Sequence, residues 1–435
     1  MNPTIKPRER EALIQSLRAG VVPRFGQHLI QVGRRREIET MKKTVETISA
    51  GGTSFRLVIG EYGSGKSFFI GLVKNIALEK KLVTVNADLS PTRRLLSSGG
   101  QARSLFSELM KNMATKTKPD GEAIASIVEK FVASTINEAE QRGIVADRVI
   151  GEKLLPLEEM FNGYDFTAVI KAYHRGYETG NDELKQSAIR WLRGEFSTKS
   201  EANHLLGVRN IINDNNIYDQ LKLMSRFVTI AGYSGLYVFL DEMVNLYKIH
   251  NTTARNGNYE QILRILNDVL QGNVCGIGFL LAGTPEFLTD TRRGLYSYEA
   301  LQSRLAENPY VHGNTVDFSG PIIRLENLTP EEFYLLIKNI RHVYAFGDPA
   351  TYMIPDEALV AFMKLSSTRL GNDYFRTPRT TIISFINFLS ILEQNPSERW
   401  ENILNVGDLD FKKDVNSDTT ALQNSNDDEF ADFVF

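Results

Sequence analysis

The stretch Gly60–Ser67, GEYGSGKS, constrains the fold of this chain more than any other feature. It fits the pattern G-x-x-x-x-G-K-[ST], in which glycines let the backbone curl so that successive amide N–H groups point at phosphate oxygens. An apolar strand is expected before it, at 55–59, and an amphipathic helix after it, with core-facing residues from Phe69 to Ile76. This strand–turn–helix context predicts an α/β fold of the P-loop NTPase type, with the positive end of a helix dipole at the loop.

Within the loop, two side chains have specific expected roles. Lys66 is expected to reach the β- and γ-phosphates of ATP, and the Ser67 hydroxyl is expected to ligate Mg²⁺. The predicted nucleotide-binding set is completed by the other loop residues and the one that follows: Gly60, Glu61, Tyr62, Gly63, Ser64, Gly65 and Phe68. We therefore predict ATP and Mg²⁺ as cofactors.

A second motif follows the continuously apolar run Leu236–Leu240. Such a run is typical of a central strand that is buried on both faces of a parallel sheet. The strand would deliver Asp241 and Glu242 to the carboxyl edge of the sheet, where α/β proteins bind their ligands. We predict that Asp241 holds Mg²⁺, mostly through water, and that Glu242 orients and deprotonates the attacking water.

The hydrophobic pattern along the chain predicts further elements. Strands are expected at 82–89, 277–282 and 322–325, and helices at 7–19, 37–49, 101–115 and 258–271, among others. The resulting fold is a three-layer α/β P-loop domain with a parallel sheet, a long helical insertion and a C-terminal helical lid. The expected domains are a basic N-terminal arm at 1–32, an ATPase domain at 33–328 with the insertion at about 91–230, a lid at 329–396 and an acidic tail at 397–435.

Composition narrows the class of protein. Hydrophobic residues make up 42% and charged residues 24% of the chain, as in an ordinary globular protein. No apolar run reaches the ~18 residues of a membrane span, and the first residues lack the apolar core of a secretory signal. The single cysteine, Cys275, excludes disulfides within the chain and thiolate metal clusters. We expect a cytoplasmic protein without membrane contact or a structural metal.

Charge is distributed unevenly along the chain. Residues 1–36 carry a net charge of +6 and residues 405–435 a net charge of −6, although the whole chain carries only −3. Such asymmetry can mark an arm that binds nucleic acid and an acidic interaction tail, but two solvated ends are the more common case. If duplex DNA is bound, we expect the N-terminal arm or the insertion to contact it, because the residues that follow the helix of Arg379 are acidic.

Two adjacent carboxylates at a strand end resemble the AAA+/STAND branch of P-loop proteins, and two features on the nucleotide side agree. Gly33 and Arg34, in QVGRRREIE, resemble the segment by which those ATPases contact the adenine. The strand FLLAGT ends at Thr284, where such proteins place a polar group near the γ-phosphate. The resemblance implies an AAA+-like parallel sheet, with these residues in the nucleotide site.

Arginines later in the chain extend this resemblance. Arg304, in SRL, resembles an arginine finger, for which Arg292 and Arg293 are the alternatives. Arg379, in TPRTTIISF, resembles the arginine with which the lid of these ATPases reaches the nucleotide, and Arg376 is its alternative. A finger acts in a neighbouring subunit, so the resemblance implies a homo-oligomer. An arginine at any of these positions is otherwise a surface residue in a weak salt bridge.

The chain as a whole resembles the BrxD-type ATP-binding proteins of BREX phage-defence systems, from about residue 3 to 395. The segments that carry this resemblance are VGRRREI, LVIGEYGSGKSFF, LVTVNADLSPTRRLLSSGGQARSLFSELM, FLDEMVNLYK and GTPEFLTDTRRGLYSYEALQSRL. The resemblance implies a bacterial cytoplasmic ATPase that works with other defence-system proteins, near DNA.

The sequence therefore predicts an ATPase that assembles so that Arg304 of one subunit reaches the nucleotide of the next. Two alternatives stay open. The chain could be a slow monomeric nucleotide switch that signals to protein partners without touching DNA. It could also be a DNA-binding module in which ATP only stabilises the fold.

Overall fold

The computed structural model describes residues 5–311, 315–370 and 378–406 of the 435-residue chain. Contacts divide the chain into two compact units. The larger unit spans residues 22–332, and the smaller unit joins residues 1–21 to the chain from residue 333 onward. All strands of the described residues lie in the larger unit, so it holds the sheet edge at which a nucleotide site is expected.

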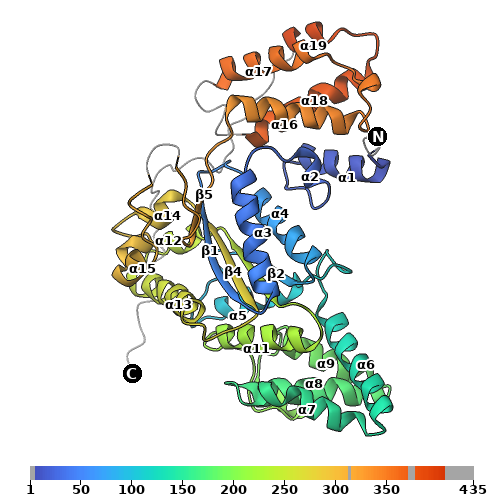
Figure 1. The fold of residues 1–435 in the computed structure, drawn as a ribbon, viewed down its shortest axis with the longest axis vertical. Coiled ribbons are helices and arrows are strands. Elements are labelled where there is room, and N and C mark those ends of the chain that lie inside the picture. The colour runs from blue at the N-terminus through green and yellow to red at the C-terminus, as the bar shows by residue number, and fades with distance from the viewer. Residues whose placement is uncertain (1–4, 312–314, 371–377, 407–435) are drawn as a thin grey trace. The chain divides into compact units, whose positions relative to one another are not determined.

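A parallel sheet of five strands forms the centre of the larger unit (Figure 1). Its strands are β1 (Thr53–Ile59), β2 (Val83–Asp88), β3 (Leu236–Asp241), β4 (Ile277–Gly283) and β5 (Ile322–Arg324), in the spatial order β2-β3-β4-β1-β5. The apolar runs that predicted these strands are thus confirmed. The parallel sheet with flanking helices confirms the α/β class and is compatible with a P-loop NTPase fold.

Helices cover both faces of the sheet, because alternate strand residues point to opposite sides. On one face, Val58 and Phe239 belong to a core shared with α3 (Arg35–Ser49) and α4 (Lys66–Glu79). On the other face, Leu57 and Val238 belong to a second core that includes residues of α5 (Gln101–Lys111), α11 (Ile217–Ile230) and α13 (Thr252–Gln271). The larger unit therefore has three layers, and a short helix, α2 (Gln27–Ile30), contacts α4.

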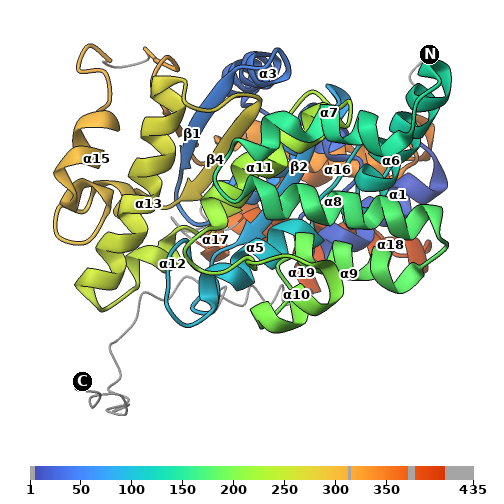
Figure 2. The ribbon, with the colours of Figure 1, turned by 90° about the horizontal axis from the view of Figure 1, so that it is seen from below.

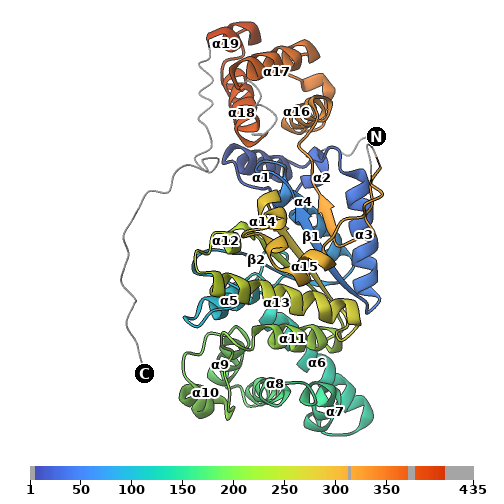
Figure 3. The ribbon, with the colours of Figure 1, turned by 90° about the vertical axis from the view of Figure 1, so that its left-hand side faces the viewer.

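The predicted insertion is helical in the structure. Its helices are α5 (Gln101–Lys111), α6 (Ile124–Arg142), α7 (Ala146–Glu158), α8 (Gly163–Glu178), α9 (Asp182–Leu192), α10 (Lys199–Leu206) and α11 (Ile217–Ile230). Helix α11 contacts both β3 and α7, so it lies between the sheet and the group formed by α6 to α10 (Figures 1 and 3). Edge-on contacts of Phe166 with Trp191 and with Phe227 help to close this helical core.

The helix expected at 101–115 ends earlier than the sequence indicated. Helix α5 stops at Lys111, and Ala114 then pairs with Thr84 of the outer strand β2. The amide of each residue donates to the carbonyl of the other, at 3.0 and 2.8 Å. This exchange satisfies backbone groups at the edge of the sheet, which a longer helix would leave unpaired.

Further helices connect the central strands beyond β3. They are α12 (Val244–Tyr247), α13 (Thr252–Gln271), α14 (Pro285–Thr289), a 3₁₀ turn η1 (Leu295–Ser297) and α15 (Glu299–Arg304). Helix α13 lies beside β1 (Figure 2) and begins six residues before the predicted 258. Asn251 explains this start, because its side chain caps the helix by accepting from the Ala254 amide at 2.9 Å.

The smaller unit is entirely helical in its described residues. Its elements are α1 (Pro7–Arg18), α16 (Pro330–Tyr344, in this unit from Phe333), η2 (Pro349–Thr351), α17 (Asp356–Leu370), α18 (Pro378–Gln394) and α19 (Trp400–Val406). Helix α1 buries Leu13, Ile14 and Leu17 and packs on α18. Contacts therefore group the first 21 residues with the C-terminal helices, whereas the sequence suggested a separate arm at 1–32. Residues 407–435 of the expected acidic tail lie outside the described residues.

Candidate functional site

Three adjacent strands end at the residues that the sequence singled out. Strand β4 lies between β1 and β3. Gly60 follows β1, Thr284 follows β4, and Asp241 is the last residue of β3. The Gly60 amide donates to the Gly283 carbonyl at 3.2 Å, and the Met243 amide donates to the Ala282 carbonyl at 3.0 Å. These bonds extend the ladder past the strand ends and hold the loop and the acidic pair at the carboxyl edge, where α/β proteins bind ligands.

The backbone of the phosphate loop has the conformation that its glycines allow. Gly63 and Gly65 have φ values of 85° and 87°, a region that other residues adopt only with strain. Among the backbone hydrogen bonds of turns, loops and caps in the described chain, none has the amide of Gly63 or Gly65 as its donor. Donors of this kind beside the first turn of α4 are suited to phosphate oxygens.

Lys66 begins α4 and folds back over the loop. Its ammonium group donates to the Gly60 carbonyl at 2.8 Å and to the Glu61 carbonyl at 2.9 Å. It also lies 5.5 Å from the ring centre of Tyr62. Burial lowers the pKa of Lys66, and nearby carboxylates, with Asp241 first, act in the opposite direction. Lys66 is therefore a charged donor whose present acceptors are neutral carbonyls, so a phosphate oxygen would be a stronger acceptor.

Phe68, the last of the predicted loop residues, has a structural position. Its side chain packs against the core between α3, α4 and the sheet. Its carbonyl accepts from the side-chain amide of the buried Gln27 at 3.4 Å. These contacts tie the segment around α2 to the start of α4.

Ser67 and Asp241 meet at the edge of the sheet. The Ser67 hydroxyl donates to Oδ2 of Asp241 at 2.7 Å. A hydroxyl and a carboxylate are ligands that Mg²⁺ prefers, and this pair offers only part of an octahedral shell. The residues thus fit an ion that keeps several waters and binds substrate phosphate, and their roles as magnesium ligands stay predictions.

Glu242 follows Asp241 in an uncommon backbone conformation, with φ of 57°. Its amide donates to Oδ1 of Asp241 at 2.8 Å, and its carbonyl accepts from Asn245 Nδ2 at 3.2 Å. Partial burial and the neighbouring Asp241 raise the pKa of Glu242, while Lys66 acts to lower it. A carboxylate with a raised pKa is a stronger base, as the predicted role in water activation requires.

Thr284 directly follows β4, the strand between those that carry the loop and the acidic pair. The residue is 2% exposed, and its hydroxyl has no hydrogen-bond partner among the described residues. A buried hydroxyl without a partner is uncommon in proteins. Its place and its free hydrogen-bonding capacity suit the predicted role near the terminal phosphate.

Gly33 and Arg34 also lie at this edge. The Arg34 guanidinium donates to the carbonyl of Ser64 in the loop, at 3.2 Å, and to the carbonyl of Glu326 beyond β5. Gly33 has φ of 61°, and a Cβ at this position would collide with the Glu332 carboxylate. Arg34 therefore connects the phosphate loop to the segment after β5, a link that the sequence did not indicate.

Asp88 is a third carboxylate at the same edge that sequence reasoning missed. It ends β2 and pairs in register with Asp241 of β3. Burial and the charge of Asp241 raise the pKa of Asp88, whereas Arg93 lowers it. The acid at the end of the expected strand 82–89 is the signal that would have found it.

The three candidates for the arginine finger are exposed or bond groups outside this cluster. Arg304 ends α15 and is exposed, and its guanidinium donates to its own helix, at Ala300 O. The Arg293 guanidinium instead donates to the carbonyls of Tyr247 and Ile249, at 3.2 and 3.4 Å. Arg292 is exposed at the surface of the larger unit.

Arg379 belongs to the smaller unit, where its Nε would lie 2.6 Å from a Cβ built on Gly20. This contact places the side chain between α18 and the end of α1. Its alternative, Arg376, lies outside the described residues. The predicted role of the lid arginine at the nucleotide stays a prediction.

Comparison with known proteins identifies the family. The family model for the BREX system ATP-binding protein BrxC/D matches residues 5–408. The chain therefore belongs to this family, which confirms the resemblance that the sequence suggested. No curated protein matches the chain significantly. In the described part of the chain, no helix has both the length and the apolar character needed to cross a membrane.

Proposed function

We propose that this BREX ATP-binding protein hydrolyses ATP with Mg²⁺ as an AAA+-like ATPase in the cytoplasm. One observation carries the proposal: Ser67 of the phosphate loop bonds Asp241, and Glu242 is the next residue. These residues come from distant parts of the chain and would have no structural need to meet as a hydroxyl–carboxylate pair beside a second acid. Their arrangement matches what phosphoryl transfer to water requires.

Each residue has a distinct task in this proposal. The amides of the loop and the Lys66 ammonium bind and orient the phosphates, and Lys66 exchanges its carbonyl acceptors for phosphate oxygens. Ser67 and Asp241 would hold Mg²⁺, which supplies neutralisation of phosphate charge when bound. Glu242 accepts a proton from the attacking water. The Thr284 hydroxyl is in place to bond either this water or the terminal phosphate.

The proposal also includes assembly into a homo-oligomer. Arg304 is exposed, and in the described residues its guanidinium makes no ion pair with an acid of its own chain, so it is available to a neighbouring subunit. A trans-acting arginine contributes on the order of 10³–10⁵ in rate. An isolated subunit should therefore hydrolyse ATP slowly. Hydrolysis would then couple the nucleotide state to duplex DNA or to other defence-system proteins.

The test measures ATP hydrolysis per subunit against protein concentration, with and without duplex DNA, and uses Glu242→Gln as the blank. A rate that rises with both concentration and DNA is the expected result. A flat, slow rate that DNA does not change would replace this proposal with a monomeric nucleotide switch that signals to protein partners. DNA binding that is undiminished in Lys66→Ala would favour a DNA-binding module stabilised by ATP.

A further inference from the structure

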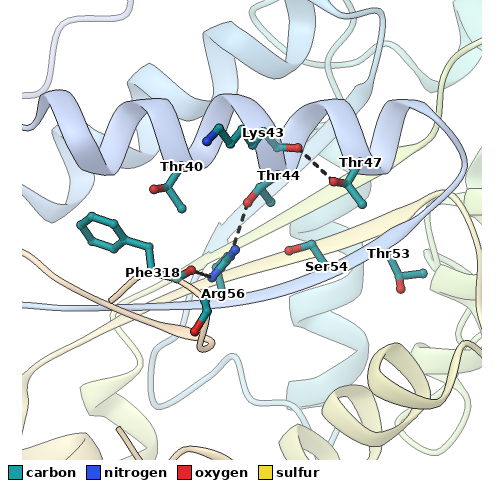
Figure 4. Close-up of a pocket in the computed structure, with 9 residues that line it drawn as sticks. Thr40, Lys43, Thr44, Thr47, Thr53, Ser54, Arg56 and Phe318 are labelled. Carbon is teal, nitrogen blue, oxygen red and sulfur yellow. Dashed lines mark hydrogen bonds between the residues drawn. The ribbon is translucent and has the colours of Figure 1, made fainter. Parts of the chain in front are cut away.

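A polar hollow of about 450 Å³ lies between α3 and the first half of β1, at the opposite end of this strand from the phosphate loop (Figure 4). Four residues of α3 line it, together with Thr53, Ser54 and Arg56 of β1 and the two residues Phe318 and Ser319. Ser54 and Arg56 share one face of the strand because they are two residues apart. Both side chains therefore lie on the α3 side of the sheet.

The lining carries positive charge and contains no acid. Lys43 and Arg56 are its charged residues. Arg56 is half-buried, and its acceptors are neutral: Nε donates to Thr44 Oγ1 at 3.4 Å, and Nη1 donates to Phe318 O at 2.9 Å and to Gly320 O. Burial lowers the pKa of Arg56, and no carboxylate of the described residues is among the groups that shift it. A half-buried cation without a counter-ion is unfavourable unless an anion can approach it.

The nearest acid in sequence does not neutralise these cations. Asp317 precedes the lining residue Phe318, but its carboxylate accepts from the Asn308 side chain at 2.8 Å and from the Ser319 amide at 2.8 Å. These hydrogen bonds lower the pKa of Asp317, and neither Arg56 nor Lys43 contributes to that shift. The charge of Arg56 is thus available to a ligand.

Some hydrogen-bond donors that line the hollow already bond the protein, and others are available to a ligand. The hydroxyls of Thr40, Thr47 and Thr53 donate to backbone carbonyls, so their protons are already used. Arg56 donates through Nε and Nη1 in the described chain, which leaves the two N–H bonds of Nη2 for a ligand. Lys43 also lines the hollow; it is exposed, and its side chain extends along α3 (Figure 4). A hollow lined by one cation from α3 and one from β1 suits a multiply charged anion with several oxygens.

We propose that this hollow binds the phosphate group of a small phosphorylated molecule. A phosphate group matches the charge of the two lining cations, Lys43 and Arg56, and the volume leaves room for an organic part beside the Phe318 ring. A small molecule fits better than a duplex, because Arg56 lies half-buried beneath α3 and the 318–320 segment, whereas a DNA backbone binds cations spread over an open surface. This site is separate from the nucleotide site, and the inference does not depend on ATP hydrolysis.

The test uses the full chain carrying Lys66→Ala, which weakens phosphate binding at the loop. Inorganic phosphate and AMP are titrated separately by isothermal calorimetry. We expect saturable binding of one phosphate per chain and a weakening of about fivefold in Lys43→Ala, as for the loss of one exposed charge. Arg56→Gln should weaken binding by about tenfold or more, because it removes a charged donor. Tighter binding of AMP than of phosphate would identify the organic part as a contributor.

Lys42→Ala is the matched control, since Lys42 is the neighbouring lysine on α3 and pairs with Glu39 at 3.0 Å. Its affinity for phosphate should equal that of the parent. Arg56→Gln also removes bonds that hold the 318–320 segment, so Lys43→Ala and Ser54→Ala decide the question if that variant does not fold. Equal phosphate affinity in Lys43→Ala and Lys42→Ala would overturn the proposal, as would the absence of saturable binding. A Lys43→Ala effect on duplex DNA binding alone would also overturn it and assign the hollow to nucleic acid.

Discussion

The Ser67 hydroxyl and the Asp241 carboxylate are 174 residues apart in the chain and 2.7 Å apart in the structure. This contact joins the helix after the phosphate loop to the end of the central strand β3. If both groups hold Mg²⁺ in the ATP complex, the hydrogen bond is exchanged for two contacts with one ion. The two halves of the candidate site would then be linked through the ion, whereas without nucleotide and magnesium the hydrogen bond links them.

The variant Ser67→Ala tests this connection. We expect it to lose the part of the ATP affinity that depends on magnesium, on the order of tenfold to a hundredfold, while the affinity measured in EDTA stays unchanged. Binding of a fluorescent ATP analogue with and without Mg²⁺ measures both quantities. Ser64→Ala is the control, because it makes the same chemical change at a buried loop hydroxyl that has no partner. A magnesium effect of normal size in Ser67→Ala would remove Ser67 from the metal site.

The variant Glu242→Gln should bind ATP but fail to hydrolyse it, and it should also be more stable than the parent at neutral pH. The fold raises the pKa of Glu242 above its usual 4.5, so the folded protein binds a proton more tightly than the unfolded chain does. At a pH above the raised pKa, the charged carboxylate therefore destabilises the folded protein, and replacement by glutamine removes this destabilisation. Part of the side chain is open to solvent, so we expect a rise in Tm of about 2 °C or less.

The pH dependence of this stabilisation follows from the same shift. Between 4.5 and the raised pKa, the stability of the parent falls as pH rises, and above that window the difference from Glu242→Gln is constant. The advantage of the variant should therefore shrink as pH is lowered toward 4.5. Thermal unfolding at a series of pH values measures it. An advantage that grows on acidification would mean that the fold favours the charged form of Glu242.

Two arginines should respond differently to replacement by alanine. Arg293 bonds the carbonyls of Tyr247 and Ile249, so Arg293→Ala should lower stability by about 1–2 kcal/mol. Arg304 is exposed and bonds only its own helix in the described chain, so Arg304→Ala should leave the Tm unchanged. If Arg304 is the finger, this variant should lose the concentration dependence of ATP hydrolysis.

Arg292→Ala is the control for these two variants, because Arg292, like Arg304, is an exposed arginine that follows β4 in the chain. Measurements of the hydrolysis rate at several protein concentrations, together with Tm, distinguish the three alanine variants. A concentration dependence that survives in Arg304→Ala and disappears in Arg292→Ala would move the finger to Arg292. Loss of the dependence in all three would indicate an indirect effect on assembly.

The sheet and the phosphate loop could be predicted from the sequence because their signals are local. The apolar run of β3 and the glycines of the loop each specify a short segment, and the parallel arrangement then brings the strand ends together. Asp88 could have been included by the same logic, since it ends β2. The link from Arg34 to the Ser64 carbonyl could not be predicted, because it depends on the tertiary position of the segment before α3.

Helix boundaries and the N-terminus were less predictable, for a related reason. The end of α5 is decided by pairing of Ala114 with Thr84, a partner on a different element. The basic residues at the start of the chain suggested an arm, but the apolar stripe of Leu13, Ile14 and Leu17 is what determines the packing of α1 on α18. Charge patterns in sequence do not show which cations are already used within the fold.

Arg10 illustrates this point for the predicted DNA contact. Its guanidinium donates to the Tyr344 carbonyl at 3.3 Å and pairs with Glu393 at 3.3 Å. It also lies over the Tyr344 ring, 4.3 Å from its centre. Arg10 is therefore a structural residue of the smaller unit. Deleting residues 1–19 would remove this contact and the buried stripe of α1, so a loss of DNA binding in the deletion could reflect unfolding.

A substitution of exposed cations tests the arm without unfolding it. Lys6, Arg8 and Arg18 are exposed, and replacing all three with glutamine leaves the buried face of α1 intact. If these residues contact DNA phosphates, affinity should fall, and the slope of log K against log salt should shrink by about 3. Fluorescence anisotropy with duplex DNA at several salt concentrations measures this slope.

The control for this substitution removes the same charge from cations that are already paired. Lys80, Lys116 and Arg399 bond Glu46, Glu79 and Glu401 at 3.0, 2.7 and 2.9 Å. Their triple glutamine variant has the same net charge as the α1 variant, so a general electrostatic effect would reduce the salt slope in both. A reduction confined to the α1 variant would locate the DNA contact on α1. An unchanged slope in both would leave the basic residues of α1 as a solvated helix face, and the DNA contact would then have to be sought on the insertion.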